Sequence, residues 1–330
     1  MTELDRALGA LYGLAIGDAL GMPTQSMTSA DIRADYGPIE DFRDAGPRQT
    51  IAAGAAAATV TDDTEQAVLL GELLVAGSGE IDPAGFAQAL LAWERQMEQK
   101  GSLDLLGPST TRAVQRLLDG LPVNEAGRYG ATNGAAMRIA PVGVARRPQP
   151  VEAFLASVVQ ASVVTHNTSL GIASAAAVAM AVSVGVEGGS REDAIEAAVR
   201  AAVLGDRHGH RVAGGRIGAR IPWAVDLLRA TPKAGRARVV EEVVGTSVAA
   251  QESVVAAFGI ASVVDDPWEA MCLAASVGGD TDTIAAMVGA MLGAVVGLHA
   301  LPAEAVDRVR RTNDLNLEPL VLGLLEIRAS

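Results

Sequence analysis

Apolar residues recur at helical spacing along most of the chain. In one segment Phe86, Leu90, Leu91 and Trp93 precede a charged run, a spacing that places apolar side chains on one face of a helix. Apolar residues again follow the helix-start signal Pro108-Ser109-Thr110. Strictly alternating patterns, which would indicate strands, are scarce. The pattern therefore predicts a chain built from helices.

Few segments interrupt this helical pattern. The stretch 239–248 is rich in β-branched residues, but Glu241, Glu242 and the flanking alanines suit a helix equally well. The Ala-rich segment 51–60 suits a loop or a short helix. Gly and Pro punctuate the chain, yet no segment is long enough to be an interdomain linker. We expect one all-α domain over residues 1–330, without a substantial sheet.

Two uncharged stretches, 167–186 and 284–300, are about long enough to cross a membrane. Both are rich in Ala, Gly and Ser rather than in Leu, Ile and Phe, and the second directly follows two aspartates. We expect buried core helices and no membrane partner.

Composition and charge narrow the class of protein. Hydrophobic residues make up 49% of the chain and aromatic residues only 3%, so closely packed small side chains must fill the core. The net charge of -13 argues against a nucleic-acid-binding surface. The lone Cys272 can form neither a disulfide within the chain nor a CxxC pair, and the N-terminus lacks the pattern of a signal peptide. We expect a cytoplasmic protein.

Two adjacent carboxylates stand at a predicted helix start, in Thr61-Asp62-Asp63-Thr64, ahead of the apolar run 67–74. Helix capping alone could explain them, and Asp62 with Glu65 has the spacing of a capping box. The motif by itself leaves capping and ligand binding open.

A second acidic motif, Gly279-Asp280-Thr281-Asp282-Thr283, opens the apolar stretch that follows it. One cap needs one acidic residue, whereas Asp280 and Asp282 repel each other unless a cation or solvent separates them. If the two helix starts converge, their oxygens suit Mg²⁺ or Mn²⁺, and the number of carboxylates favours two ions. The predicted ligands are Thr61, Asp62, Asp63, Asp280, Asp282 and Thr283.

Five short motifs follow one another along the chain: Gly17-Asp18-Ala19-Leu20-Gly21, Thr61-Asp62-Asp63-Thr64, Asn133-Gly134-Ala135-Ala136-Met137-Arg138, His166-Asn167 and Gly279-Asp280-Thr281-Asp282-Thr283. They occur in the order typical of ADP-ribosylglycohydrolases, which the chain resembles over nearly its whole length. Each motif alone is weak, but five in this order are specific.

This resemblance implies a compact orthogonal bundle of many helices and a dinuclear Mg²⁺ or Mn²⁺ centre. It also implies hydrolysis of the bond between the anomeric carbon of the distal ribose and an acceptor, which releases ADP-ribose. Asp62 or Asp63 would take the proton of the attacking water. Many relatives carry Glu where this chain has Gln25, and an amide can orient a ligand but cannot accept that proton.

The resemblance also implies substrate contacts at Asp18, Gln25, Asn133, Gly134 and His166. On their own, the glycines around residue 134 would indicate an ordinary turn, or a loop opening a helix that could receive a diphosphate. His166 would by itself be a cap or a satisfied interior histidine.

The expected partner is an ADP-ribosylated substrate, with nucleic acid only as a modified substrate, and the expected assembly is a monomer or dimer. Two alternatives stay open. One is a metal-dependent N-glycosidase of a small nucleoside derivative, and the other is a catalytically silent relative used for binding or structure. The acceptor could be arginine, serine, nucleic acid or a small molecule.

Overall fold

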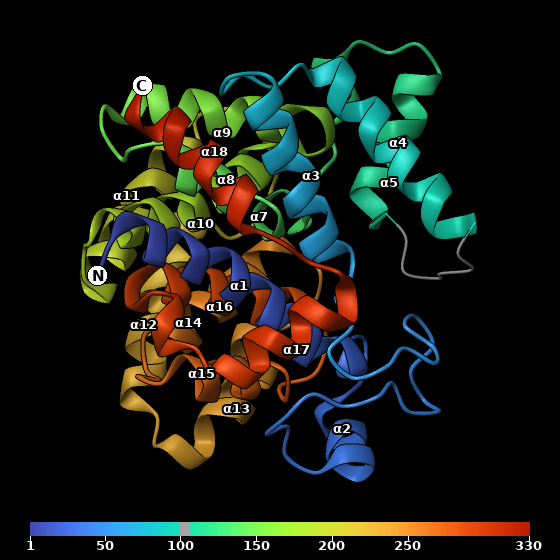
Figure 1. Ribbon diagram of the computed structural model, residues 1–330, viewed down its shortest axis with the longest axis vertical. Coiled ribbons are helices and arrows are strands. Elements are labelled where there is room, and N and C mark those ends of the chain that lie inside the picture. The colour runs from blue at the N-terminus through green and yellow to red at the C-terminus, as the bar shows by residue number, and fades with distance from the viewer. Residues whose placement is uncertain (100–105) are drawn as a thin grey trace.

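The computed structural model describes residues 1–99 and 106–330, and the regular structure of these residues is helical (Figure 1). Three isolated β-bridges are the nearest approach to a sheet in this part of the chain. The α-helices are α1 Glu3–Gly21, α2 Ser29–Tyr36, α3 Asp62–Ala76, α4 Pro83–Gln99, α5 Pro108–Leu118, α6 Val123–Ala126, α7 Gly134–Met137, α8 Ala140–Ala145, α9 Val151–His166, α10 Ser169–Glu187, α11 Arg191–Gly205, α12 Ile217–Ala230, α13 Arg236–Val239, α14 Ala250–Ala261, α15 Pro267–Ala274, α16 Thr281–Val296, α17 Ala303–Asn313 and α18 Glu318–Ala329.

The all-helical prediction is confirmed. The segments that begin ahead of Phe86 and at Pro108 form α4 and α5. The β-branched stretch 239–248 continues α13 into the π-helical turn Val240–Val244 and forms no strand. The Ala-rich segment 51–60 contains turns and no helix.

The two long apolar stretches form α10 and α16, which lie inside the bundle (Figure 1). Among the described residues, α10 is the one helix long and apolar enough to cross a membrane, and 94% of its apolar window is buried within the protein. Its composition of Ala, Gly, Ser and Val allows neighbouring helices to pack against it on all sides. Both stretches are therefore core helices.

Helices α1 and α16 lie side by side at the centre of the molecule, with their backbones in direct contact (Figure 1). A Cβ atom at Gly13 would stand 2.2 Å from the carbonyl oxygen of Gly289, and one at Gly17 would stand 2.0 Å from that of Ala285. Such distances leave no room for any side chain. The shared seam of small residues consists of Gly9, Gly13, Gly17 and Gly21 on α1 against Asp282, Ala285, Gly289 and Gly293 on α16.

This glycine seam brings two of the sequence motifs together. Asp18 follows Gly17 directly in the chain, and at the last position of the seam a Cβ on Gly21 would lie 2.4 Å from Cα of Asp282. The seam therefore determines how close the start of α16 comes to the segment that carries Asp18.

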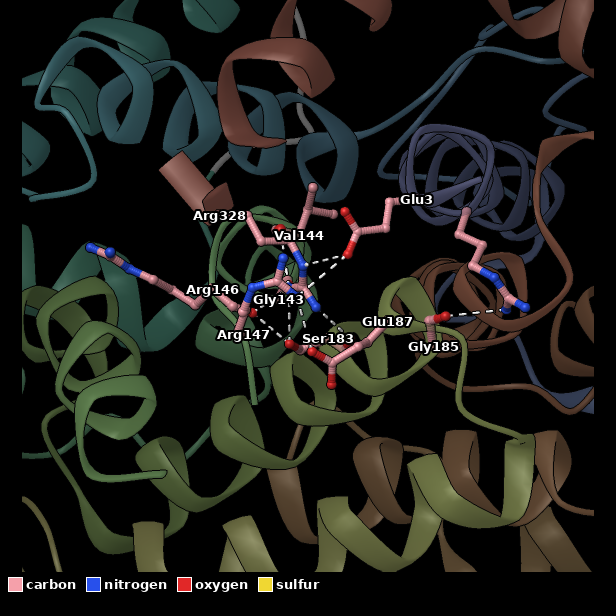
Figure 2. A network of polar contacts seen from close by, with 10 residues as sticks. Glu3, Gly143, Val144, Arg146, Arg147, Ser183, Gly185, Glu187 and Arg328 are labelled. Atoms are coloured by element: carbon pink, nitrogen blue, oxygen red, sulfur yellow. Dashed lines mark hydrogen bonds and ion pairs between the residues drawn. The ribbon is translucent and has the colours of Figure 1, made fainter. Parts of the chain in front are cut away.

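The C-terminal helix is attached to the bundle through Arg328, which is 4% exposed (Figure 2). Its guanidinium donates to the carbonyl oxygens of Gly143 and Val144 and to those of Arg146 and Ser183. These acceptors belong to the end of α8, the residue after it, and α10. One side chain thus joins the C-terminal helix to α8, to the residue after it and to α10.

Substitution Arg328→Met is expected to lower the free energy of unfolding by about 3 kcal/mol, because hydrogen bonds from a charged donor contribute about 1.5 to 3 kcal/mol each and several are lost at once. Urea unfolding followed by circular dichroism measures this change. Arg229→Met, at an exposed position on α12, serves as the control and should stay within about 0.5 kcal/mol of the wild type. Equal effects of the two substitutions would contradict the anchoring role.

Candidate functional site

The first acidic motif begins α3, and the buried carboxylate of Asp18 accepts hydrogen bonds from it. Thr61 is the N-cap, and its hydroxyl accepts from the amide of Asp63. The fully buried Asp18 carboxylate accepts from the amides of Thr61 (3.0 Å) and Thr64 (3.1 Å) and from both of their hydroxyls. Burial raises the pKa of Asp18 to about 6, although these hydrogen bonds oppose the shift. Helix capping is thus part of the function of this motif, but Thr61 and the Asp18 carboxylate together perform it, rather than Asp62.

The second acidic motif begins α16 after a tight turn. Gly278 and Gly279 have positive φ angles of 81° and 75°, which glycine adopts without strain. The amide of Ser26 donates to the carbonyl of Gly279 (2.7 Å), and the amide of Asp280 donates to that of Thr246 (2.7 Å). Backbone bonds on both sides therefore fix where Asp280 and the first turn of α16 stand.

The two acidic motifs converge, which the sequence alone left open. Thr283 Oγ1 donates to Asp63 Oδ1 at 3.2 Å, across 220 residues of sequence. Asp63 is fully buried, and burial followed by the negative charges of Asp282, Asp18 and Asp62 holds its pKa well above the usual value. Burial also raises the pKa of Asp280. The protein thus concentrates carboxylates that repel one another.

A cavity of about 250 Å³ opens in front of these carboxylates. Seven of the predicted site residues line it: Gln25, Asp62, Asn133, Gly134, Asp280, Asp282 and Thr283. Asn133 Nδ2 donates to Ser253 Oγ (2.9 Å) and to Asp280 Oδ2, so the Asn-Gly segment is joined to the second acidic motif. The helix that follows, α7, has only one turn, so the expected helix start for a diphosphate is weaker than the sequence indicated.

Four predicted residues do not line this cavity, and two of them correct an expectation. Asp18 and His166 were expected to contact substrate, but both are fully buried. Asp18 caps α3, and the His166 imidazole lies between the hydroxyls of Thr132 and Thr165.

Thr61 and Asp63 also lie behind the cavity lining. The Thr61 hydroxyl donates to Asp18 and accepts from the amide of Asp63, which leaves it one lone pair for a cation. Asp63 Oδ2 is buried and has no hydrogen-bond partner among the described residues. These two residues could reach an ion only from beneath the surface that a substrate would touch.

Gln25, where the resemblance implies Glu in many family members, lines the cavity. It is 5% exposed, and its Nε2 has no hydrogen-bond partner in residues 1–99 and 106–330. The buried Gln49 holds this turn, because its Nε2 donates to the carbonyls of Gln25 (3.1 Å) and Met22 (3.2 Å) while its Oε1 accepts from the amide of Ile51. Gln49 has no motif around it, so this role could not be predicted from the sequence.

Cation binding is favoured by the donor set, although the side chains do not form a complete cage. Within the described ranges, no group of three or more His, Cys, Asp or Glu side chains is placed to hold a metal ion. Hydroxyl, amide and water oxygens would have to complete a shell, which is usual for Mg²⁺. The orphaned oxygen of Asp63 and the mutual repulsion of the aspartates both fit a cation at this place.

A larger hollow, of about 810 Å³, lies on another side of α3, between α4 and the end of α17. It contains Thr64 and Glu65 but none of the four aspartates of the two motifs. Glu65 accepts there from Nε1 of Trp93 (2.5 Å). Because the clustered aspartates and the Asn-Gly segment face the smaller cavity, that cavity is the candidate active site.

Comparison with known proteins agrees with the order of the motifs. The family model described as ADP-ribosylglycohydrolase matches residues 1–328. The protein YegU of Escherichia coli is 31% identical over 99% of this chain and 98% of its own length. The ADP-ribosylarginine hydrolase Tri1 of Pseudomonas putida is 29% identical over 93% of this chain and 74% of its own length. A solved ADP-ribosylglycohydrolase-related protein complex superposes with a TM-score of 0.71 at 27% identity, covering 98% of each chain. The chain therefore belongs to the ADP-ribosylglycohydrolase family.

Proposed function

We propose that this protein hydrolyses the glycosidic bond between the distal ribose of ADP-ribose and an acceptor group, with the help of two divalent cations, Mg²⁺ or Mn²⁺. The observation that carries the proposal is the convergence of two acidic helix starts on one cavity, in a chain that belongs to this family. Water adds to the anomeric carbon, the bond to the acceptor breaks, and the acceptor leaves with a proton.

Asp62 is the best placed residue to take the proton of the attacking water. Its carboxylate lines the cavity, whereas Asp63 is fully buried behind it. Gln66 Nε2 donates to Asp62 Oδ2 (2.7 Å), which orients the carboxylate as an acceptor. Because Gln25 carries no acidic proton and cannot take one, it would orient the ligand.

The cations would be held by Asp62, Asp63, Asp280, Asp282 and Thr283, with Thr61 contributing its remaining lone pair. When bound, such ions polarise ribose hydroxyls and lower the pKa of a water molecule. The orphaned Asp63 oxygen supports this assignment, as does the repulsion among the aspartates. The cavity volume lies near the lower end of ligand sites, about 300 to 1,000 Å³, which suits the distal ribose and leaves the rest of ADP-ribose outside.

The direct test is release of ADP-ribose from arginine-linked and serine-linked peptides, in Mg²⁺, in Mn²⁺ and in EDTA, followed by liquid chromatography and mass spectrometry. We expect release from one of the two peptides, its loss in EDTA, and a decrease of roughly a hundredfold to a thousandfold for Asp62→Asn. Asp226→Asn, an exposed carboxylate on α12, is the matched control and should retain full activity.

The outcomes separate the alternatives. Metal binding by calorimetry without release from either peptide would replace this proposal with an N-glycosidase of a small nucleoside derivative. Absence of both metal binding and hydrolysis would indicate a silent relative.

A further inference from the structure

Arg138 is buried behind the candidate active site, and within residues 1–99 and 106–330 no carboxylate forms an ion pair with it. Arg138 is fully buried, and its guanidinium lies 5.1 Å from the centre of the Phe86 ring. Burial lowers its pKa to about 10, and the nearby charge of Asp62 acts in the opposite direction. Enclosing a charged guanidinium in a protein core is costly unless its donors are hydrogen-bonded, and two of its nitrogens donate to buried side chains, those of Gln66 and Thr165.

A first chain of hydrogen bonds, the Asp62 arm, runs from Arg138 through Gln66 to Asp62. Arg138 Nη1 donates to Gln66 Oε1 (2.9 Å), so this atom of Gln66 is fixed as the carbonyl oxygen. The other end of the same amide must then be the NH₂ group, which donates to Asp62 Oδ2 (2.7 Å). A guanidinium can only donate, and therefore the whole arm delivers a donor to the Asp62 carboxylate.

A second chain of hydrogen bonds, the Thr132 arm, runs from Arg138 through Thr165 to the imidazole of His166. Arg138 Nη2 donates to Thr165 Oγ1, which stands 2.7 Å from His166 Nδ1. Thr165 is fully buried, and its hydroxyl proton would lack an acceptor if Nδ1 also donated to it. An unsatisfied buried donor costs about 1 to 3 kcal/mol. The Thr165 hydroxyl therefore donates to Nδ1, and the imidazole proton resides on Nε2.

The Thr132 arm ends at the wall of the cavity. His166 Nε2 stands 2.9 Å from Thr132 Oγ1, and Thr132 lines the cavity. A protonated Nε2 donates to this oxygen, which leaves the hydroxyl proton of Thr132 available to a ligand. Burial and the charge of Arg138 both lower the pKa of His166 well below its usual value, in keeping with a neutral ring.

We infer that Arg138 is a positioning residue that gives the two walls of the cavity opposite hydrogen-bonding roles. It keeps Asp62 an acceptor and makes Thr132 a donor, so the Thr132 side of the cavity recognises an oxygen acceptor of the ligand, such as a phosphate, carbonyl or ether oxygen. The inference deepens the proposed function and rests on it only for the identity of that ligand.

Gly134 leaves room for the imidazole of His166 in this position. A Cβ atom at this position would stand 2.9 Å from Cε1 and 3.2 Å from Nε2 of His166. The absence of a side chain thus allows the ring to lie against the Asn-Gly segment, where Nε2 meets Thr132. This contact gives Gly134 a role in positioning His166, besides lining the cavity.

The tautomer of His166 can be measured in the protein without any ligand. Correlation spectra of the ring nitrogens of ¹⁵N-histidine-labelled protein, assigned by the signal missing in His166→Gln, should show an unprotonated Nδ1 and a protonated Nε2. Thr165→Val should shift His166 toward a mixture of tautomers, and Thr165→Ser should restore the single form. A protonated Nδ1 in the wild type would overturn the inference.

Two variants separate the two arms. Thr165→Val breaks the arm to Thr132, and we expect it to weaken substrate affinity by about tenfold, seen mainly in KM, as Thr132→Val should and Thr132→Ser should not. Gln66→Leu breaks the arm to Asp62, and we expect it to lower kcat while the His166 signals stay unchanged. Identical effects of the two variants on kcat, KM and the His166 signals would contradict two independent arms.

Failure of this inference can be distinguished from failure of the proposed function. If Nδ1 of His166 is protonated in an enzyme that releases ADP-ribose, only the positioning role of Arg138 is overturned. If Nε2 is protonated in a protein that hydrolyses neither peptide, the positioning role is supported and the proposed function is overturned.

Discussion

Asp282→Asn is expected to lower ADP-ribose release strongly and, in the absence of metal, to make the protein more stable. Asp282 is the charged neighbour with the largest effect in raising the pKa of the buried Asp63. Removing one negative charge relieves this repulsion, and a gain of about 1 kcal/mol corresponds to a rise in Tm of roughly 2 to 4 °C. Loss of a cation ligand should lower activity by roughly a hundredfold to a thousandfold.

Thermal unfolding in EDTA measures the stability of the protein without metal, and thermal unfolding in Mn²⁺ measures the stabilisation by the bound ion. The wild type should gain Tm when Mn²⁺ is added, because a ligand that binds only the folded state stabilises it, and Asp282→Asn should lose most of this gain. Asp307→Asn, on the exposed side of α17, should change neither quantity. A lower Tm of Asp282→Asn in EDTA would show that the hydrogen bonds of this carboxylate outweigh the repulsion.

The acidic motifs could be predicted from the sequence because their signal is local. Each has carboxylates and hydroxyls directly before an apolar run, and the second also follows glycines with positive φ. Local sequence does not reveal which of these oxygens face a ligand. Asp62 lines the cavity while Asp63, the next residue, is fully buried, since consecutive helical residues point in different directions.

The positioning residues could not be predicted in this way. Arg138 is buried because Phe86 and Gln66, from two other helices, close over it, and no pattern around residue 138 records that contact. His166 was expected at the ligand because of the family resemblance, although the residue by itself indicated a cap or a satisfied interior histidine. In the structure Thr132 stands between the imidazole and the cavity, so the effect of His166 is transmitted through a hydroxyl.

The glycine seam explains how the predicted motifs come together. The low aromatic content predicts close helix packing, but it does not show which helices touch. Glycines at a spacing of four residues on α1 form one face of that helix and meet a matching face of α16. The distance between the helices is therefore set by backbone atoms, and any added side chain must change it.

Gly13→Ala is expected to destabilise the protein by about 3 kcal/mol or more, although alanine favours helix formation over glycine by about 0.5 to 1 kcal/mol. The added Cβ would stand 2.2 Å from the carbonyl oxygen of Gly289 and 2.8 Å from its carbonyl carbon. Both contacts are with backbone, which cannot rotate away, so α1 and α16 must separate. Chemical unfolding followed by circular dichroism measures the loss.

Gly85→Ala on α4 is the matched control, because within the described residues its added Cβ would meet the Asp82 side chain alone, at 3.1 Å from Oδ2, and no backbone atom. It should be neutral or slightly stabilising. Separation of α1 from α16 would also move Asp282 away from the α3 start that Asp18 caps. Gly13→Ala should therefore weaken Mn²⁺ binding as well as stability, and retention of wild-type Mn²⁺ affinity would show that the site tolerates a wider seam.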